Sequence, residues 1–179
     1  MPHVIEAAKT GRAKCRGCGT NIAAGDLRFG ERVPNPFADD GGETTHWFHL
    51  ACAAYMRPEP FLETLATVTD AIANRETLER EARLGVAHRR LPRATTVERA
   101  PSGRATCRAC KKTIDKGTWR IALMYYEDGR FAPSGSIHVV CAPAYLETAG
   151  VVGRLTHFTP TLGDTDLKEI QALLDAPAV

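Results

Sequence analysis

The residues best suited to chemistry are six cysteines and two histidines, which fall into two sets of the same spacing. The first set is Cys15-x-x-Cys18 with His49-x-x-Cys52, and the second is Cys107-x-x-Cys110 with His138-x-x-Cys141. Thiolate sulfur and imidazole nitrogen are ligands that Zn²⁺ prefers, and three cysteines with one histidine fill its four tetrahedral positions. Because a catalytic zinc keeps one position open for water, the pattern predicts two structural Zn²⁺ ions.

Three disulfides in an exported domain are the main alternative for six cysteines. The start of the chain, Met1-Pro2-His3, lacks the basic and then apolar segment of a secretory signal. Disulfides would also not require a histidine three residues before both Cys52 and Cys141, and neither would a redox Cys-x-x-Cys pair. Reduced, metal-bound thiols suit an intracellular protein, in the cytoplasm or nucleoid of a prokaryote or the nucleus of a eukaryote.

The elements around the two cysteine sets repeat along the chain. Segment 4–15 aligns with segment 96–107 without a gap. The match continues at the same offset, so that Ile22, Gly25 and Arg28 correspond to Ile114, Gly117 and Arg120. This internal similarity predicts two copies of one structural unit. Units of this size are only marginally stable on apolar burial alone, so we expect the metal to contribute to their folding free energy.

Each copy is expected to begin with an extended segment, followed by the Cys-x-x-Cys turn and a strand at 27–33 or 119–126. A loop then follows at 34–42 in the first copy and at 127–135 in the second, where Asp128-Gly129 is typical of a hairpin. A return strand delivers the histidine, and a short helix carries the last cysteine. These helices should end near Arg57, before Pro58, and near Gly150.

The remaining segments are predicted to be mainly helical. Phe61, Leu65, Val68 and Ile72 recur at helical spacing, a break follows Asn74, and a second helix should end at Gly85. Segment 153–160 is expected to be extended or irregular, and 166–174 to form a last helix. The fold class is therefore α+β, with a zinc module at 1–57, a helical linker at 58–95, a second module at 96–150 and a C-terminal extension at 151–179.

Composition excludes some classes of protein. The 179 residues carry a net charge of only +2, so any nucleic-acid surface must be a local patch rather than a property of the whole chain. No apolar run approaches the roughly twenty residues of a membrane-spanning helix. We find no nucleophile–base set, phosphate-binding glycine loop or carboxylate pair, so an enzyme is not expected, and a monomer is favoured.

The first copy resembles the zinc finger of poly(ADP-ribose) polymerases, which also occurs on some DNA ligases. The resemblance rests on Gly11-Arg12-Ala13-x-Cys15-x-x-Cys18, Leu27-Arg28 and His46-Trp47-Phe48-His49-x-x-Cys52. The second copy keeps Gly103-Arg104-Ala105-x-Cys107-x-x-Cys110 but lacks the aromatic pair before His138. The resemblance implies recognition of DNA strand breaks without sequence specificity, in a damage sensor or a repair accessory that could recruit repair enzymes. We see no room in this chain for a polymerase domain.

Basic residues around the cysteine turns agree with that implication. Arginine donates two parallel hydrogen bonds to phosphate, and such contacts hold a protein on DNA without reading sequence. The candidate phosphate-binding residues are Arg12, Lys14, Arg16 and Arg28 in the first copy, and Arg104, Arg108 and Arg120 in the second.

Aromatic residues could contact the base pair that a nick or an end exposes, since stacking ignores base identity. The candidates are Phe37 in the first copy, with a second apolar contact from Thr44 or Thr45, and Phe131 in the second copy. Tyr125 and Tyr126 are alternatives to Phe131, and alternation should place at least one of them in the core. Trp47 and Trp119 are expected to be core residues beside the metal sites.

Two other functions remain open from the sequence. Paired zinc units of LIM-like type bind proteins, so an interaction adaptor is one alternative, and an RNA-binding regulatory zinc protein is the other. Both differ from a break sensor in having no preference for nicked over sealed DNA.

Overall fold

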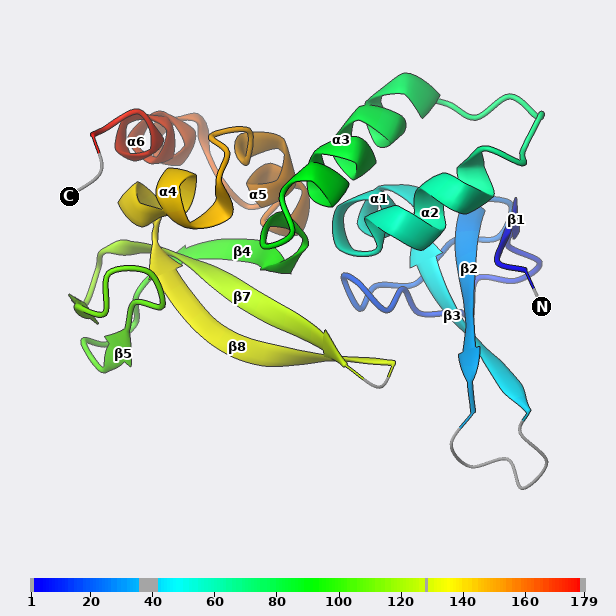
Figure 1. Cartoon of the computed structure of the whole chain (residues 1–179), viewed down its shortest axis with the longest axis horizontal. Coiled ribbons are helices and arrows are strands. Elements are labelled where there is room, and N and C mark those ends of the chain that lie inside the picture. Colours follow the sequence, from blue (N-terminus) through cyan, green and yellow to red (C-terminus); the bar gives the residue numbers. More distant parts are fainter. Residues whose placement is uncertain (1, 36–41, 128, 178–179) are drawn as a thin grey trace. The chain divides into compact units, whose positions relative to one another are not determined.

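The computed structural model describes residues 2–35, 42–127 and 129–177, and the chain divides into two compact units, Met1–Ala87 and His88–Val179. Each unit combines a three-stranded antiparallel sheet with helices, so the fold is α+β, as predicted (Figure 1). Within the described part of the chain, no helix has the length and apolar character needed to cross a membrane.

The sheet of the first unit has the order β1-β2-β3, from strands Val4–Ala7, Leu27–Pro34 and Glu43–His49. Phe29 on β2 and Phe48 on β3 are direct cross-strand partners, and both are fully buried. Phe61 packs edge-on against Phe29, with ring centroids 5.7 Å apart. This aromatic cluster forms the core on which the helices of the unit rest.

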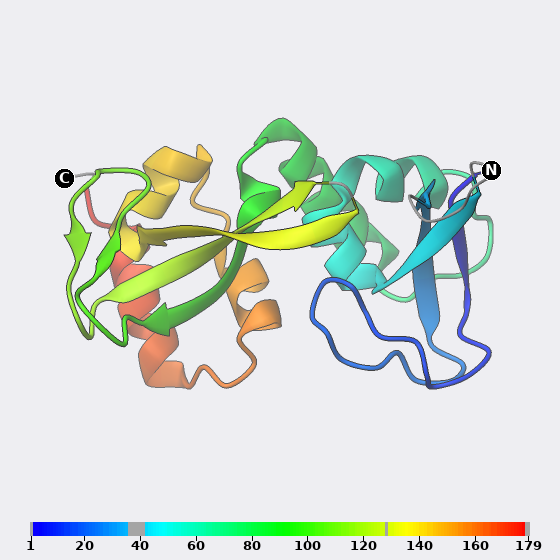
Figure 2. The same cartoon turned by 90° about the horizontal axis from the view of Figure 1, so that it is seen from below.

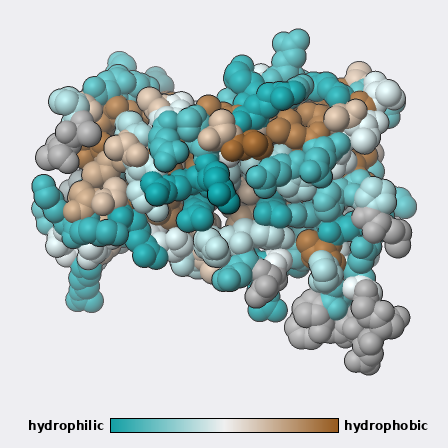
Figure 3. Space-filling view, viewed as in Figure 1, coloured by the Kyte–Doolittle hydropathy of each residue, from teal (hydrophilic) through white to brown (hydrophobic). Residues whose placement is uncertain are grey.

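Three helices complete the first unit: α1 (Leu50–Met56), α2 (Pro58–Leu65) and α3 (Arg75–Ala87). Helix α1 follows β3 directly, and α3 packs on α1 and α2. The break after Asn74 is confirmed, since Asn74 has a φ of 58° just before α3. Hydrophobic surface remains between α2 and α3 on the face shown in Figure 3, and Val86 is 40% exposed.

Two details of the helical prediction for this region are wrong. The stripe does not form one helix to Ile72, because α2 ends at Leu65; Ile72 is nevertheless buried. Gly85 does not end the second helix but lies buried within α3, on the unit's inner side. The predicted linker 58–95 is divided by the structure, which places α2 and α3 in the first unit and the 3-10 turn η1 (Leu91–Arg93) in the second.

The main sheet of the second unit has the order β4-β7-β8, from strands Ala94–Arg99, Trp119–Glu127 and Arg130–His138. A two-stranded sheet pairs β5 (Ala105–Thr106) with β6 (Thr113–Ile114). The hairpin prediction is confirmed, because Glu127 pairs with Arg130 and Gly129 has a φ of 73°.

The loop predicted at 127–135 is wrong, since β8 begins at Arg130. Pro133 suggested a loop because it cannot donate a ladder hydrogen bond. Strand β8 lies at the edge of the sheet, and its register with β7 shifts between Ala122 and Met124, the latter pairing with Pro133. An edge position and a bulge are the places where a sheet tolerates proline.

In both views of the second unit, its helices lie on one side of this sheet (Figures 1 and 2). They are α4 (Ala142–Leu146), α5 (Val152–Phe158) and α6 (Asp164–Leu174), and the 3-10 turn η2 (Val139–Cys141) precedes them. The predicted end near Gly150 is wrong, because α4 stops at Leu146 and Glu147 adopts a φ of 63°. Segment 153–160 is not irregular either, since it forms most of α5, where Leu155 is fully buried.

The last helix is tied to the sheet by one polar cluster. Trp119 on β7 donates from Nε1 to Glu169 Oε2 at 2.9 Å, and Arg99 on β4 pairs with the same oxygen. The Arg99 guanidinium also lies over the Trp119 ring, 4.4 Å from its centroid. Trp119 is 7% exposed, which confirms its prediction as a core residue.

Candidate metal centres and nucleic-acid interface

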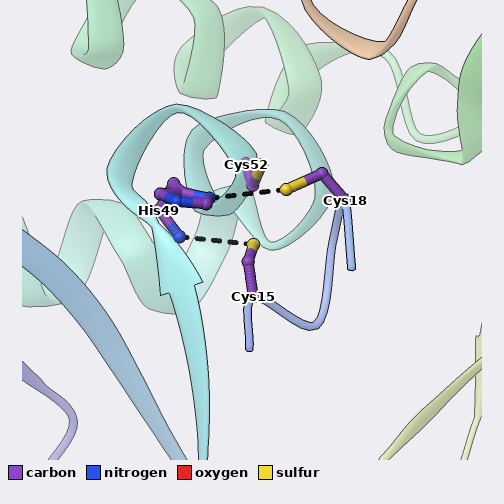
Figure 4. A group of neighbouring side chains, drawn as sticks. All are labelled: Cys15, Cys18, His49 and Cys52. Atoms are coloured by element: carbon purple, nitrogen blue, oxygen red, sulfur yellow. Dashed lines mark hydrogen bonds between the residues drawn. The ribbon is translucent and has the colours of Figure 1, made fainter. Parts of the chain in front are cut away.

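The first metal centre brings together Cys15 and Cys18 from the turn after β1, His49 at the end of β3, and Cys52 in α1. Their ligand atoms all lie within 4.8 Å of one another. Figure 4 shows the four side chains converging on one point, with His49 Nδ1 facing Cys18 Sγ at 3.4 Å. Strand and helix meet at His49, so the His-x-x-Cys pair projects toward the cysteine turn.

Backbone hydrogen bonds shape the turn that presents Cys15. The Cys15 N–H donates to the Thr20 carbonyl at 2.8 Å, and the Gly19 N–H donates to the Cys15 carbonyl at 2.9 Å. The His49 N–H points at Cys15 Sγ from 3.4 Å (Figure 4). A hydrogen bond from Cys52 is the main cause that lowers the pKa of Cys15 to about 4, and the same contact, with burial, raises the pKa of Cys52.

The second metal centre has the same construction. Cys107, Cys110, His138 and Cys141 also place their ligand atoms within 4.8 Å of one another. His138 Nδ1 faces Cys110 Sγ at 3.5 Å, while its Nε2 lies 3.2 Å from the Thr113 carbonyl. An Nε2–H that donates to this carbonyl leaves Nδ1 free as a metal ligand and fixes the ring orientation.

Both groups fit Zn²⁺ on the chemistry of their donors. Each offers three sulfurs and one nitrogen, and Zn–S bonds of about 2.3 Å in a tetrahedron separate neighbouring sulfurs by about 3.8 Å. In each group all four ligand atoms lie within 4.8 Å of one another, so one ion can contact all of them. With four protein ligands each, the two centres are closed, structural zinc sites, as the spacing of the cysteines predicts.

The two centres differ in how tightly the helix packs behind them. A Cβ added at Gly17 would lie 2.9 Å from Cys52 Cβ and 3.0 Å from Met56 Sδ, so this space is filled in the first unit. The second unit has Ala109 at the equivalent position and a cavity of about 310 Å³ beside its metal site. The cavity is lined by Arg90, Ala109, Cys110, Val140, Cys141, Ala144 and Tyr145.

The predicted phosphate-binding residues fall into two classes. Five of them are exposed around the two cysteine turns: Arg12, Lys14, Arg16, Arg104 and Arg108. Arg108, in the second cysteine turn, is oriented by strand β8, because its Nε donates to the Ser134 carbonyl at 2.8 Å. The other two, Arg28 and Arg120, lie on strands and are each engaged by a glutamate, Glu6 at 2.7 Å and Glu98 at 2.5 Å.

The structure describes all but one of the predicted base-contacting residues. Phe37 lies outside the described residues, and Thr44 is half-buried on β3 opposite Val33. Phe131 on β8 is half-buried and contacts Tyr126 on β7, with ring centroids 4.6 Å apart.

The expectation that a tyrosine of this hairpin lies in the core is wrong. Tyr125 is 40% exposed beneath the Arg93 guanidinium, and Tyr126 is half-buried. The ladder between β4 and β7 ends at Leu123, so beyond that residue the β7–β8 ribbon has only two strands. This part of the ribbon therefore lacks the third strand that would help to bury the tyrosines.

Sequence reasoning missed the partners of the strand arginines. Glu6 and Glu98 occupy equivalent places in the ungapped repeat, which is a signal that could have identified them. Trp47 was expected in the core, but it is half-buried and carries the Arg28 guanidinium 3.5 Å above its ring.

A buried polar group joins β2 and β3 of the first unit. Glu31 is 3% exposed, and its two carboxylate oxygens share the Nε–H of Arg57, at 3.0 and 2.8 Å. His46, beside it on β3, is 6% exposed. Burial is the main cause that lowers the pKa of His46, and the charge of Arg16 adds to the effect.

Comparison with known proteins agrees with the geometry of the first unit. Residues 6–88 match the family described as "Poly(ADP-ribose) polymerase and DNA-Ligase Zn-finger region". This segment contains the first metal centre and reaches past α3, so the helices after α1 belong to the matched region.

Three curated relatives show how far the similarity extends. Poly [ADP-ribose] polymerase 1 of Gallus gallus is 32% identical over 136 residues, covering 68% of this chain and 13% of the relative. The Poly [ADP-ribose] polymerase of Sarcophaga peregrina is 32% identical over 144 residues, covering 71% and 14%. Poly [ADP-ribose] polymerase 1 of Caenorhabditis elegans is 42% identical over 52 residues, covering 29% and 5%. The chain thus spans about one seventh or less of the length of these relatives.

Proposed function

We propose that this chain binds double-stranded DNA at strand breaks, as a zinc-dependent damage sensor or repair accessory that does not read sequence. The observation that carries the proposal is the group of exposed basic side chains next to a closed metal centre, in the segment that matches the zinc-finger family. These side chains are Arg12, Lys14 and Arg16. Guanidinium groups bind phosphate oxygens regardless of base identity. A closed zinc site has no vacant position for catalysis, so its role is to hold the turn in shape.

We propose the same role for the second unit, as a second finger on the same chain. Its support is internal: Arg104, Arg120 and the second metal centre fall at the positions that Arg12, Arg28 and the first centre occupy in the repeat. An alignment over 68% of the chain also includes residues of both units, since each unit holds about half. Two fingers on one chain raise the effective concentration of the second contact and so strengthen binding.

Base contacts at the break are the second part of the proposal. Phe37 and Thr44 would serve in the first unit, and Phe131 in the second, where Tyr126 supports it from the neighbouring strand. A base face is accessible at a nick or an end and not within a sealed duplex, so an aromatic contact of about 1–3 kcal/mol favours broken DNA.

A titration with three DNA substrates tests the function. The zinc-loaded chain is added to a nicked duplex, a blunt duplex and a sealed circle of matched sequence, and binding is followed by fluorescence anisotropy. We expect nicked or blunt DNA to bind about 5- to 150-fold more tightly per site than the circle, which is the factor that one stacking contact of about 1–3 kcal/mol supplies. Equal affinity for all three substrates would refute the proposal.

The variant Arg12→Gln with Arg104→Gln tests the phosphate contacts. Affinity for nicked DNA should fall by roughly tenfold or more, because two charge-assisted contacts are lost. The matched control is Arg80→Gln with Arg83→Gln, which removes the same charge from side chains that are 68% and 69% exposed on α3. An equal loss of affinity in the control would show that the effect comes from net charge and not from contacts made by Arg12 and Arg104.

A further inference from the structure

Both strand arginines of the proposed DNA surface face a glutamate on the neighbouring strand. Glu6 and Arg28 are direct partners in the β1–β2 ladder, and Glu98 and Arg120 are direct partners in the β4–β7 ladder. Arg28 Nη2 lies 2.7 Å from Glu6 Oε1. In the second unit, Nε and Nη2 of Arg120 both donate to Glu98 Oε1, at 3.1 and 2.5 Å. The same pair therefore occurs twice, at equivalent positions of the repeat.

The two arginines differ in how firmly they are enclosed. The Arg28 side chain is 9% exposed, because it is stacked on Trp47 and paired with Glu6. Trp47 itself is held against Gly30, where an added Cβ would lie 2.6 Å from the ring.

The second unit has a small residue at the equivalent place. The position of Trp47 is taken by Ser136, whose carbonyl accepts from Arg108 N–H as that of Trp47 accepts from Arg16 N–H. The Arg120 side chain is accordingly more accessible, at 18% exposed, and Glu98 is 52% exposed. Arg120 is thus held chiefly by its carboxylate partner.

We propose that Glu6 and Glu98 are affinity-setting residues that compete with DNA phosphate for these two guanidinium groups. The inference rests on the proposed function. Carboxylate and phosphate oxygens use the same donors of a guanidinium group, so a phosphate must displace the glutamate or share the arginine with it. An arginine that is already neutralised attracts the DNA backbone less and releases fewer counterions when it binds.

Weak phosphate contacts suit a protein that recognises breaks. Sealed and broken duplexes carry the same backbone phosphates, so strong phosphate contacts alone would hold the protein on intact DNA. Glutamates that weaken these contacts leave stable binding dependent on the base face that a break exposes. In this way Glu6 and Glu98 limit occupancy of undamaged DNA without touching a base.

The test replaces each carboxylate by its neutral isostere in the full, zinc-loaded chain. Glu6→Gln and Glu98→Gln are titrated with nicked duplex and with sealed circular duplex over a range of salt concentrations. We expect affinity for both substrates to rise on the order of two- to tenfold at low salt. The plot of log affinity against log salt should steepen by up to about 0.9 per arginine released. The effect of Glu98→Gln should exceed that of Glu6→Gln, since Arg120 is the less enclosed arginine.

The matched control is Glu79→Gln on α3. Glu79 pairs with Arg83 at 2.6 Å, so its replacement makes the same change in net charge and also frees an arginine. It lies on helix α3 rather than on a strand, and its replacement should leave the salt slope at the wild-type value. The double variant Glu98→Gln with Arg120→Gln should lose the gain, which assigns it to the freed guanidinium. Zinc content and thermal unfolding of each variant show that the fold is intact.

Two results would overturn the inference while leaving the proposed function standing. One is a lower affinity for DNA in the glutamine variants, because the carboxylates would then support the arginines rather than compete with DNA. The other is a change in affinity and slope no larger than that of Glu79→Gln. If the wild-type chain binds neither nicked nor sealed DNA, the proposed function fails and the inference falls with it.

Discussion

At the scale of single residues, spacing identifies the metal ligands better than it identifies their surroundings. The His-x-x-Cys and Cys-x-x-Cys patterns are local, and the structure brings all eight ligands together in two groups. The partner of Arg28 depends on strand pairing, since Glu6 lies far from it in sequence but directly opposite in the ladder. A sequence pattern shows which residues can bind phosphate, but not which of them a neighbouring strand already engages.

The buried imidazole of His46 predicts a dependence of stability on pH. Its pKa in the folded state is lowered from the ordinary value of 6.5, mainly by burial. The unfolded state therefore binds the proton more readily, so the contribution of neutral His46 is present above pH 6.5 and is lost as pH falls below it.

The measurement compares the wild type with His46→Gln by urea unfolding between pH 8 and pH 5. The difference in unfolding free energy between the two proteins should shift in favour of the variant as pH falls. Loss of zinc in acid affects both proteins alike and cancels in the difference. A difference that stays constant across this range would contradict the prediction.

At the scale of elements, strands and turns were easier to predict than helix ends. The strand beginning at Leu27 and the hairpin at Gly129 follow from local patterns, and both are confirmed. The ends of α2 and α4 depend on tertiary packing and on backbone conformations such as that of Glu147, which composition does not show. Segment 153–160 became helical because Leu155 finds a buried place, and this could not be read from its short sequence.

Helix α6 is predicted to support the second metal centre, because it packs against η2, which carries Cys141. Ile170 on α6 is fully buried, so Ile170→Ala should lower the unfolding free energy by about 2–5 kcal/mol. Zinc at the second site should also become easier to remove by a chelator.

Urea unfolding and the rate of zinc transfer to a colorimetric chelator measure both effects. The control is Gln171→Ala, an exposed neighbour on the same helix, which should change neither quantity appreciably. Unchanged zinc release in a destabilised Ile170→Ala protein would show that α6 does not support the site.

At the scale of the whole molecule, each unit has its own core and its own metal centre. Loss of one zinc should therefore unfold one unit and leave the other folded. Cys52→Ser removes a fully buried ligand of the first site, and Cys141→Ser removes the equivalent ligand of the second.

Each variant should retain about one zinc per chain and lose the amide NMR signals of a single unit, because metal binding is coupled to folding. Excess chelator should collapse both units of the wild type. Loss of both sets of signals in either single variant would show that the two units fold as one cooperative system.

One backbone detail distinguishes the two cysteine turns. Gly19 closes the first turn with a φ of 77°, a conformation that glycine adopts without steric cost, whereas Lys111 closes the second with a φ of 65°. A lysine held in this left-handed region gives up roughly 1 kcal/mol of local stability compared with glycine. In exchange the second turn gains an ammonium group, which folds back onto the Arg108 carbonyl at 2.8 Å. The lysine side chain thus makes a charge-assisted hydrogen bond within the second turn that the glycine of the first turn cannot make.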